Sequence, residues 1–289
     1  MEDVLIRFRL GLILILLFLV ACSMDEPQLA SPTISPLLVT FTPEPTFKNT
    51  KPSSPIPSST PTMDLVVTTT IVQGCPPIPG YSQLQLIDAI SNPFNPPSRP
   101  GSDDPHQAVD LAVTENGLSM PGSPVHAMLD GITAAVISDR FPYGNALLVE
   151  TGLDSLPLGW IEGLTLPTPA PTLGPHPSLT CPHPETPNEY EQDRRSLYIL
   201  YAHMGEAPAL SLDEPIRCGE EVGVIGQSGN ALNPHLHLEA RIGPAGARFE
   251  GLAHYETRAS PEEMWGYCQW RVSGWFQLVD PTSLIQRLP

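Results

Sequence analysis

The stretch that decides the fold reads Pro234-His235-Leu236-His237-Leu238-Glu239. Polar and apolar side chains alternate along it, which is the pattern of a half-buried β-strand. Because strand side chains repeat with a period of two, both histidines and the glutamate are expected on one face. Two imidazoles on one face leave ring nitrogens that need partners, so this strand predicts chemistry as well as structure.

Two other segments also place histidine in strand-like contexts. His106 and Asp110 are four residues apart in His106-Gln107-Ala108-Val109-Asp110, so they share a strand face, and His203 ends the apolar run Tyr201-Ala202-His203. A single histidine of this kind is more often a hydrogen-bonded core residue than a ligand. Two imidazoles, one carboxylate and a water, however, form the ligand set of an open catalytic zinc site. The three segments together therefore predict a zinc centre.

The rest of the domain shows the same short-strand pattern. Strand-like runs occur at residues 108–113, 131–137, 146–150, 197–201 and 221–225, with glycine-rich turns and few helical runs. This pattern predicts a mostly β domain, an antiparallel sandwich or barrel. A stretch rich in Pro and Thr, about 153–195, is predicted to be a long loop inserted between two strands.

In order and spacing, these segments resemble the lysostaphin-like (LytM-type) zinc endopeptidases, which cut peptide links in peptidoglycan. The matching segments are His106-x-x-x-Asp110, Tyr201-Ala202-His203, Gly226-Gln227-Ser228-Gly229, Pro234–Glu239, Gly122–Ala127, Tyr143-Gly144-Asn145 and Val279-Asp280-Pro281. The resemblance covers roughly residues 90 to 285 and implies a β fold of the duplicated hybrid motif type. One departure is Ala108, where the family usually has glycine.

The resemblance also implies a role for each matching polar residue. The implied zinc ligands are His106, Asp110 and His237. His203 and His235 would be the unliganded pair that positions the attacking water and stabilises the transition state, as general base and oxyanion donor. Glu239 has two open interpretations, a partner that orients an imidazole or a structural salt bridge.

Four cysteines lie in the predicted domain, namely Cys75, Cys181, Cys218 and Cys268. Their spacing does not fit a four-cysteine zinc site, so two disulfides are the favoured interpretation. Three connectivities are open from the sequence. We expect Cys75 to pair with Cys268, and Cys181 with Cys218.

The N-terminus predicts export. Arg7 and Arg9 precede an apolar run from Leu10 to Val20, and Leu19-Val20-Ala21-Cys22 resembles a bacterial lipobox, in which the cysteine is acylated. An uncleaved transmembrane anchor is the alternative, but the run is short for a membrane-spanning helix. We therefore predict a signal peptide at residues 1–21 and a membrane-anchored lipoprotein outside the cytoplasm. Residues 22–74 are predicted to be a disordered Pro/Ser/Thr-rich tether, and residues 75–289 the zinc peptidase domain.

Charge limits the choice of partners. The chain has a formal net charge of −17, and its first 74 residues hold six acidic and four basic residues. The predicted domain thus carries about −15 and no lysine, so nucleic acid is an unsuitable partner. The expected substrate is a peptidoglycan peptide, and we expect a monomeric domain.

Two other functions fit parts of the pattern. A non-catalytic activator or scaffold for another cell-wall hydrolase is one, although no zinc-site or catalytic position is lost. A zinc-binding or zinc-sensing lipoprotein is the other, but it leaves His203 unexplained. The sequence leaves open which peptide bond is cut.

Overall fold

The structure is a computed structural model that describes residues 74–96, 105–156, 158–162, 164, 181–182 and 191–289. The chain divides into two units, Met1–Leu65 and Val66–Pro289, and every described residue belongs to the second. The predicted signal peptide, Cys22, nearly all of the predicted tether and much of the predicted insertion lie outside the described residues. Within the described part, no helix is long and apolar enough to cross a membrane.

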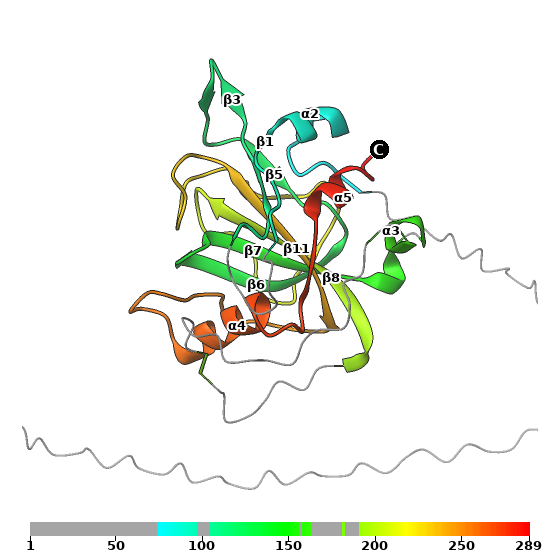
Figure 1. Ribbon diagram of the computed structural model, residues 1–289, viewed down its shortest axis with the longest axis vertical. Helices are drawn as coiled ribbons and strands as arrows, with labels where there is room; N and C mark the ends of the chain where they lie inside the picture. The colour runs from blue at the N-terminus through cyan, green and yellow to red at the C-terminus, as the bar shows by residue number, and fades with distance from the viewer. Residues whose placement is uncertain (1–73, 97–104, 157, 163, 165–180, 183–190) are drawn as a thin grey trace, which may run out of the picture. The chain divides into compact units, whose positions relative to one another are not determined.

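Strands dominate the described residues (Figure 1). They are β1 (Ile90–Asn92), β2 (Val109–Leu111), β3 (Thr114–Glu115), β4 (Leu118–Ser119), β5 (Pro124–His126), β6 (Gly131–Arg140), β7 (Gly144–Gly152), β8 (Glu191–Met204), β9 (Pro215–Ile216), β10 (Glu221–Val224), β11 (Leu236–Ala245) and β12 (Gln277–Val279). The helices are α2 (Gln83–Asp88), η1 (Leu153–Ser155), α3 (Leu158–Glu162), α4 (Pro261–Arg271) and α5 (Pro281–Ile285).

One antiparallel sheet organises the described residues. Its strands run in the order β1-β2-β11-β8-β7-β6-β9, and β12 pairs with β11 beside this path. Two small antiparallel pairs, β10 with β5 and β3 with β4, complete the strands of the described residues. The prediction of a mostly β, antiparallel domain is confirmed.

Both faces of the central strands are buried, because each face packs against its own layer. In β8, Leu197 and Tyr201 belong to a core cluster shared with α2, α5 and the β5–β10 pair. The alternate residues Tyr198 and Leu200 belong to a second cluster, which contains residues of α4. The zinc-site residues predicted from β2 and β11 lie on this second face.

The connection between β11 and β12, residues 246–276, carries α4. Ser260 caps the helix by accepting a hydrogen bond from the backbone N–H of Glu263, whose carboxylate accepts from the backbone N–H of Ser260 in return. Pro261 fills the first helical position, where its missing N–H has no cost. These are local sequence signals for a helix, which the predicted pattern of strands did not include.

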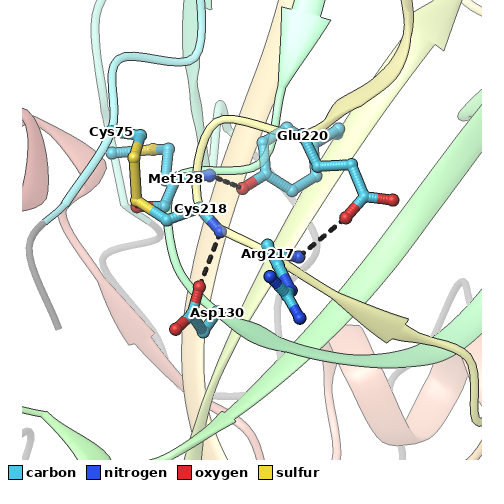
Figure 2. The surroundings of a disulfide bond; sticks show 7 residues. Cys75, Met128, Asp130, Arg217, Cys218 and Glu220 are labelled. Carbon is cyan, nitrogen blue, oxygen red and sulfur yellow. Dashed lines mark hydrogen bonds between the residues drawn. A yellow bond between two sulfur atoms is a disulfide. The ribbon is translucent and has the colours of Figure 1, made fainter. Parts of the chain in front are cut away.

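The expected disulfide pairing is wrong. The disulfides join Cys75 to Cys218 and Cys181 to Cys268, with Cα–Cα distances of 5.5 Å and 5.9 Å. Cys75 lies next to Cys218 because the backbone N–H of each cysteine is hydrogen-bonded to the same short segment, residues 128–130. The Cys75 N–H donates to the Met128 carbonyl. The Cys218 N–H donates to Asp130 Oδ1 at 2.7 Å (Figure 2). Such long-range approach has no local sequence signal. Two disulfides are typical of a protein that folds in an oxidising compartment outside the cytoplasm.

Strand β8 begins at Glu191, within the predicted insertion, and is therefore longer than the strand-like run 197–201 predicts. The described start of the segment after β7 is also structured, since η1 follows β7 directly and α3 comes next. Trp160 of α3 is buried in the first core cluster. The segment that follows β7 therefore packs against the core at its beginning, and the predicted insertion ends in residues of β8 that pair with β11.

Candidate metal centre

Pairing of β2 with β11 places the first two polar groups of the site together. His237 is directly opposite Asp110 in the antiparallel register, and the two side chains lie on one face. The distance between His237 Nδ1 and Asp110 Oδ1 is 2.9 Å. Asn92 of β1 donates from Nδ2 to the other oxygen of Asp110, Oδ2, at 3.1 Å. The amide therefore fixes the carboxylate and leaves Oδ1 turned toward the histidines.

His106 approaches the same oxygen from the segment before β2. Its Nε2 lies 3.0 Å from Asp110 Oδ1, and its Nδ1 lies 3.1 Å from the carbonyl oxygen of Pro93. The donor atoms of His106, Asp110 and His237 all lie within 4.8 Å of one another, close enough to hold one metal ion. The structure thus brings together the three residues predicted as ligands.

His203 reaches the site through an unusual backbone conformation. Strand alternation places Ala202 in the core on the site face, so His203 would point to the opposite face. At His203, however, φ is +61°, in the left-handed region, and the strand alternation ends there. Its Nδ1 lies 2.8 Å from the Ser228 carbonyl oxygen. The Gly226–Gly229 turn thus supplies the hydrogen-bond partner of this ring.

His235 completes the group two residues before His237. Its Nδ1 lies 2.7 Å from the Asn233 carbonyl oxygen, and its Nε2 lies 3.5 Å from Asp110 Oδ1. The rings of His203 and His235 meet edge to face with centroids 4.9 Å apart. His203, His235 and His237 form a second group with donor atoms within 4.8 Å, so His237 belongs to both.

The outward hydrogen bonds determine which ring nitrogens face the centre as lone pairs. A carbonyl oxygen only accepts, so Nδ1 of His106, His203 and His235 must carry the proton. The inward Nε2 atoms of the neutral rings are then lone pairs. In His106 this lone pair faces the carboxylate oxygen Asp110 Oδ1, which is unfavourable unless a proton or a cation lies between them. The donor set therefore fits a bound cation, and two imidazoles with one carboxylate are a ligand set of open zinc sites.

Glu239 lies behind His237 on the same strand face. Its Oε2 is 3.7 Å from His237 Nε2, longer than a hydrogen bond, and it accepts from the Tyr143 hydroxyl at 3.0 Å. Arg241 Nε donates to Oε1 at 2.7 Å, and Arg271 Nη1 donates to Oε2 at 3.1 Å. Glu239 is therefore both the partner that faces an imidazole and a member of a salt bridge, the two interpretations that the sequence left open.

Burial and neighbouring charges shift the pKa values of the carboxylates and of His203 in the site. Burial alone would raise the pKa of Glu239, but Arg241 and Arg271 hold it well below its usual range. Burial likewise opposes ionisation of Asp110, yet its close contacts with the imidazoles of His106 and His237 lower its pKa. Burial lowers the pKa of His203 to about 3, so this imidazole is neutral at physiological pH.

The site opens into a cleft with a volume of about 590 Å³. The five predicted metal-site and catalytic residues line it, together with side chains from three other parts of the domain: Asn92 and Ser119, the segment Phe141–Tyr143, and Tyr255, Tyr267 and Arg271 of the β11–β12 connection. The side chain of His235 is 13% exposed and that of Asp110 is 11% exposed. The centre is thus accessible from the cleft, as an open catalytic site requires.

Several residues of the site had no assigned role in the sequence interpretation. Asn92, Arg241 and Arg271 were not singled out, and Tyr143 was only part of a matching motif. Arg241 follows Glu239 by two residues, so alternation of the strand was an available signal for it. The position of Arg271 depends on how the β11–β12 connection folds back, for which the sequence has no local signal.

Comparisons with solved structures identify similar proteins. They include the catalytic domain of the prophage-encoded M23 protein EnpA from Enterococcus faecalis (16% identity, 55% of this chain and 85% of that chain covered, TM-score 0.32). The catalytic domain of lysostaphin from Staphylococcus simulans is 15% identical, with 56% and 86% covered and a TM-score of 0.33. A zinc-containing peptidase from Vibrio cholerae is 20% identical, with 59% and 36% covered and a TM-score of 0.31.

One of these proteins is lysostaphin, which gives its name to the family that the sequence motifs resemble. Their TM-scores are low, so neither activity nor site roles are carried over from them. No protein-family model and no curated protein matches the chain.

Proposed function

We propose that this chain is a zinc metalloendopeptidase that hydrolyses peptide bonds in bacterial peptidoglycan. The observation that carries the proposal is the convergence of three imidazoles, those of His106, His235 and His237, on one carboxylate oxygen, Asp110 Oδ1, in an open cleft, with a fourth imidazole, His203, grouped with His235 and His237. Such a group at a cleft, rather than in a closed core, suits catalysis better than structural metal binding.

Of the two overlapping groups, His106, Asp110 and His237 are the proposed ligands. Only this group contains a carboxylate, and Asn92 and Glu239 lie behind two of its members in the manner of outer partners that orient metal ligands. When bound, zinc would polarise the scissile carbonyl and lower the pKa of a water molecule next to it.

The two remaining histidines, His203 and His235, accept and donate protons in the proposed reaction. His203 is kept neutral by burial, which lowers its pKa to about 3, and its Nδ1 proton is committed to the Ser228 carbonyl. Its Nε2 lone pair is therefore available to accept a proton from the attacking water. His235 is less buried, and its Nδ1 is held by Asn233. When protonated at Nε2, it donates to the oxygen on which negative charge develops.

The substrate proposal rests on the motif resemblance and on the predicted route of export. A lipid anchor at Cys22 and a tether over residues 22–74 would hold the domain in the cell envelope within reach of peptidoglycan. The acidity of the domain disfavours long-range capture of anionic wall polymers. Recognition must therefore come from the cleft, which suits a peptide segment rather than a charged polymer.

The test is digestion of purified sacculi by the zinc-loaded protein, followed by mass analysis of the released muropeptides. We expect new peptide fragments, and we expect His203→Ala and His235→Ala to abolish them. If zinc is bound and no peptide bond is cut, the chain is not a peptidase. In that case, stimulation of a partner amidase by Asp110→Ala would identify a non-catalytic activator.

A further inference from the structure

The β11–β12 connection builds one wall of the cleft. Its residues Tyr255, Tyr267 and Arg271 line the same cavity as the histidines of the metal centre. Arg271 is bound to Glu239, and Tyr267 is only 2% exposed, so both belong to the packed floor. Tyr255 differs from them, because it is 50% exposed. This tyrosine therefore presents a large aromatic surface to the cleft.

The backbone of Tyr255 is in a conformation that bulky residues rarely adopt. Its φ is +63°, in the left-handed region that glycine and asparagine occupy most readily. Among the described non-glycine residues with positive φ, His203 is the other member that lines the cleft. Strained residues of this kind cluster at functional sites, where the surrounding structure holds them in place.

Hydrogen bonds hold Tyr255 in this conformation from both sides. The N–H of His254 donates to the Phe141 carbonyl at 2.9 Å, and the N–H of Phe141 donates to Glu256 Oε1 at 3.2 Å. The N–H of Tyr255 itself donates to His254 Nδ1 at 2.9 Å. Arg258 further forms ion pairs with Asp139 of β6 and with Glu256 of the same loop.

The chemistry of this wall suits an uncharged peptide segment. Phe141, Pro142 and Tyr267 line the cleft with Tyr255, and the one cationic group among the lining residues, Arg271, is already bound to Glu239. The ring of Tyr255 meets that of His254 edge to face, with centroids 4.4 Å apart, which fixes the plane of the phenol. A fixed aromatic face binds small aliphatic groups by apolar contact at little entropic cost.

We propose that Tyr255 is a specificity-determining residue whose ring binds small, uncharged residues of the substrate next to the bond that is cut. This inference rests on the proposed peptidase function and adds the substrate contact to it. In this backbone conformation Tyr255 lines the cleft. A glycine at this position would relieve the strain and remove the contact.

The test compares Tyr255→Gly, Tyr255→Phe and the control Trp275→Ala in muropeptide digestion. Trp275 is a 43% exposed aromatic residue that does not line the cleft. For Tyr255→Gly we expect KM to rise about tenfold, with kcat, zinc affinity and Tm close to those of the wild type. Tyr255→Phe and Trp275→Ala should keep KM within about twofold. A purely structural role would instead lower Tm and leave KM unchanged, which would overturn the proposal.

Binding separates this proposal from the proposed function. Soluble disaccharide-peptide fragments of peptidoglycan are titrated into zinc-loaded His203→Ala, with and without Tyr255→Gly. We expect the dissociation constant to rise about tenfold when the ring is removed. Equal affinities would overturn the role of Tyr255 even if the wild type cuts peptidoglycan. A rise, together with a wild type that cuts no peptide bond, would support Tyr255 as a ligand contact and reject the peptidase.

Discussion

At the scale of single residues, the site is defined by what holds each imidazole from behind. Carbonyl oxygens of Pro93, Ser228 and Asn233 hold three rings, and Glu239 faces the fourth. A backbone carbonyl needs no particular side chain. Glu239 is the exception, and it lies between two arginines, so its substitution should affect both metal and fold.

Glu239→Gln should weaken zinc affinity about 10- to 100-fold, because the carboxylate orients His237 and favours its ligand tautomer. Affinity is measured by competition with a chelator of known zinc affinity. The matched control is Glu150→Gln, since Glu150 is also a buried carboxylate bound by an arginine but lies outside the site. If folded Glu239→Gln binds zinc as tightly as this control, Glu239 has only a structural role.

Parts of this residue-scale account could be predicted from the sequence, and others could not. The shared strand face of His237 and Glu239 follows from a period of two, and the ligand set follows from the motifs. The turn of His203 into the site does not, because its φ of +61° depends on the Ser228 carbonyl and the backbone around it. The approach of Arg271 depends on the folding of a connection whose own helix, α4, was missed.

At the scale of elements, the start of β7 supports the Ser228 carbonyl that holds His203. Gly144 has φ +69°, and a Cβ added there would lie 2.4 Å from the Ser228 carbonyl carbon and 2.5 Å from Gly229 N. The Ser228 hydroxyl also accepts from Asn145 N–H at 2.8 Å. The turn and the strand therefore fit together only without a side chain at this position.

Gly144→Ala should lower the free energy of unfolding by about 3 kcal/mol or more, since it adds a backbone clash to an unfavourable φ. Gly117→Ala is the control. Gly117 has φ +78° but no atom within 4 Å of an added Cβ, so only the conformational cost of about 1 kcal/mol applies. Urea denaturation measures both. Equal losses would show that the approach of the turn to β7 is not needed for stability.

Glu150 joins β7 to β8 and to the end of β11. It accepts from the Ser196 hydroxyl, from Gly246 N–H and from Arg248. Burial would raise its pKa, but these bonds hold the pKa below its usual value. Its contribution is therefore fully present above the unfolded pKa and is lost as pH falls below about 4.5. Glu150→Gln should flatten the pH dependence of stability in that range, and an unchanged slope in acid denaturation would contradict this.

At the scale of the whole molecule, the disulfides fix segments that are far apart in the sequence. Cys75 and Cys218 are separated by 143 residues, and Cys181 and Cys268 by 87. The second bond fastens the segment before β8 to α4, one turn before Arg271. Cysteine number predicted the two bonds, but not the pairing, because no local pattern encodes which distant segments meet.

Replacing Cys75 and Cys218 together with serine should lower the free energy of unfolding by about 2–5 kcal/mol, because the unfolded chain gains conformational freedom. Thermal unfolding of the oxidised variant and wild type measures the loss. Zinc affinity should stay unchanged, because neither cysteine contacts the site. A variant with wild-type stability would contradict the proposed contribution of this bond.

We propose that one ion is held by His106, Asp110 and His237 and not by the overlapping group of His203, His235 and His237. Zinc content and affinity of Asp110→Ala and His203→Ala, compared with the wild type, test it most directly. We expect one zinc per wild-type chain, its loss in Asp110→Ala, and wild-type zinc content without peptidase activity in His203→Ala. Zinc retained by Asp110→Ala and lost by His203→Ala would contradict it.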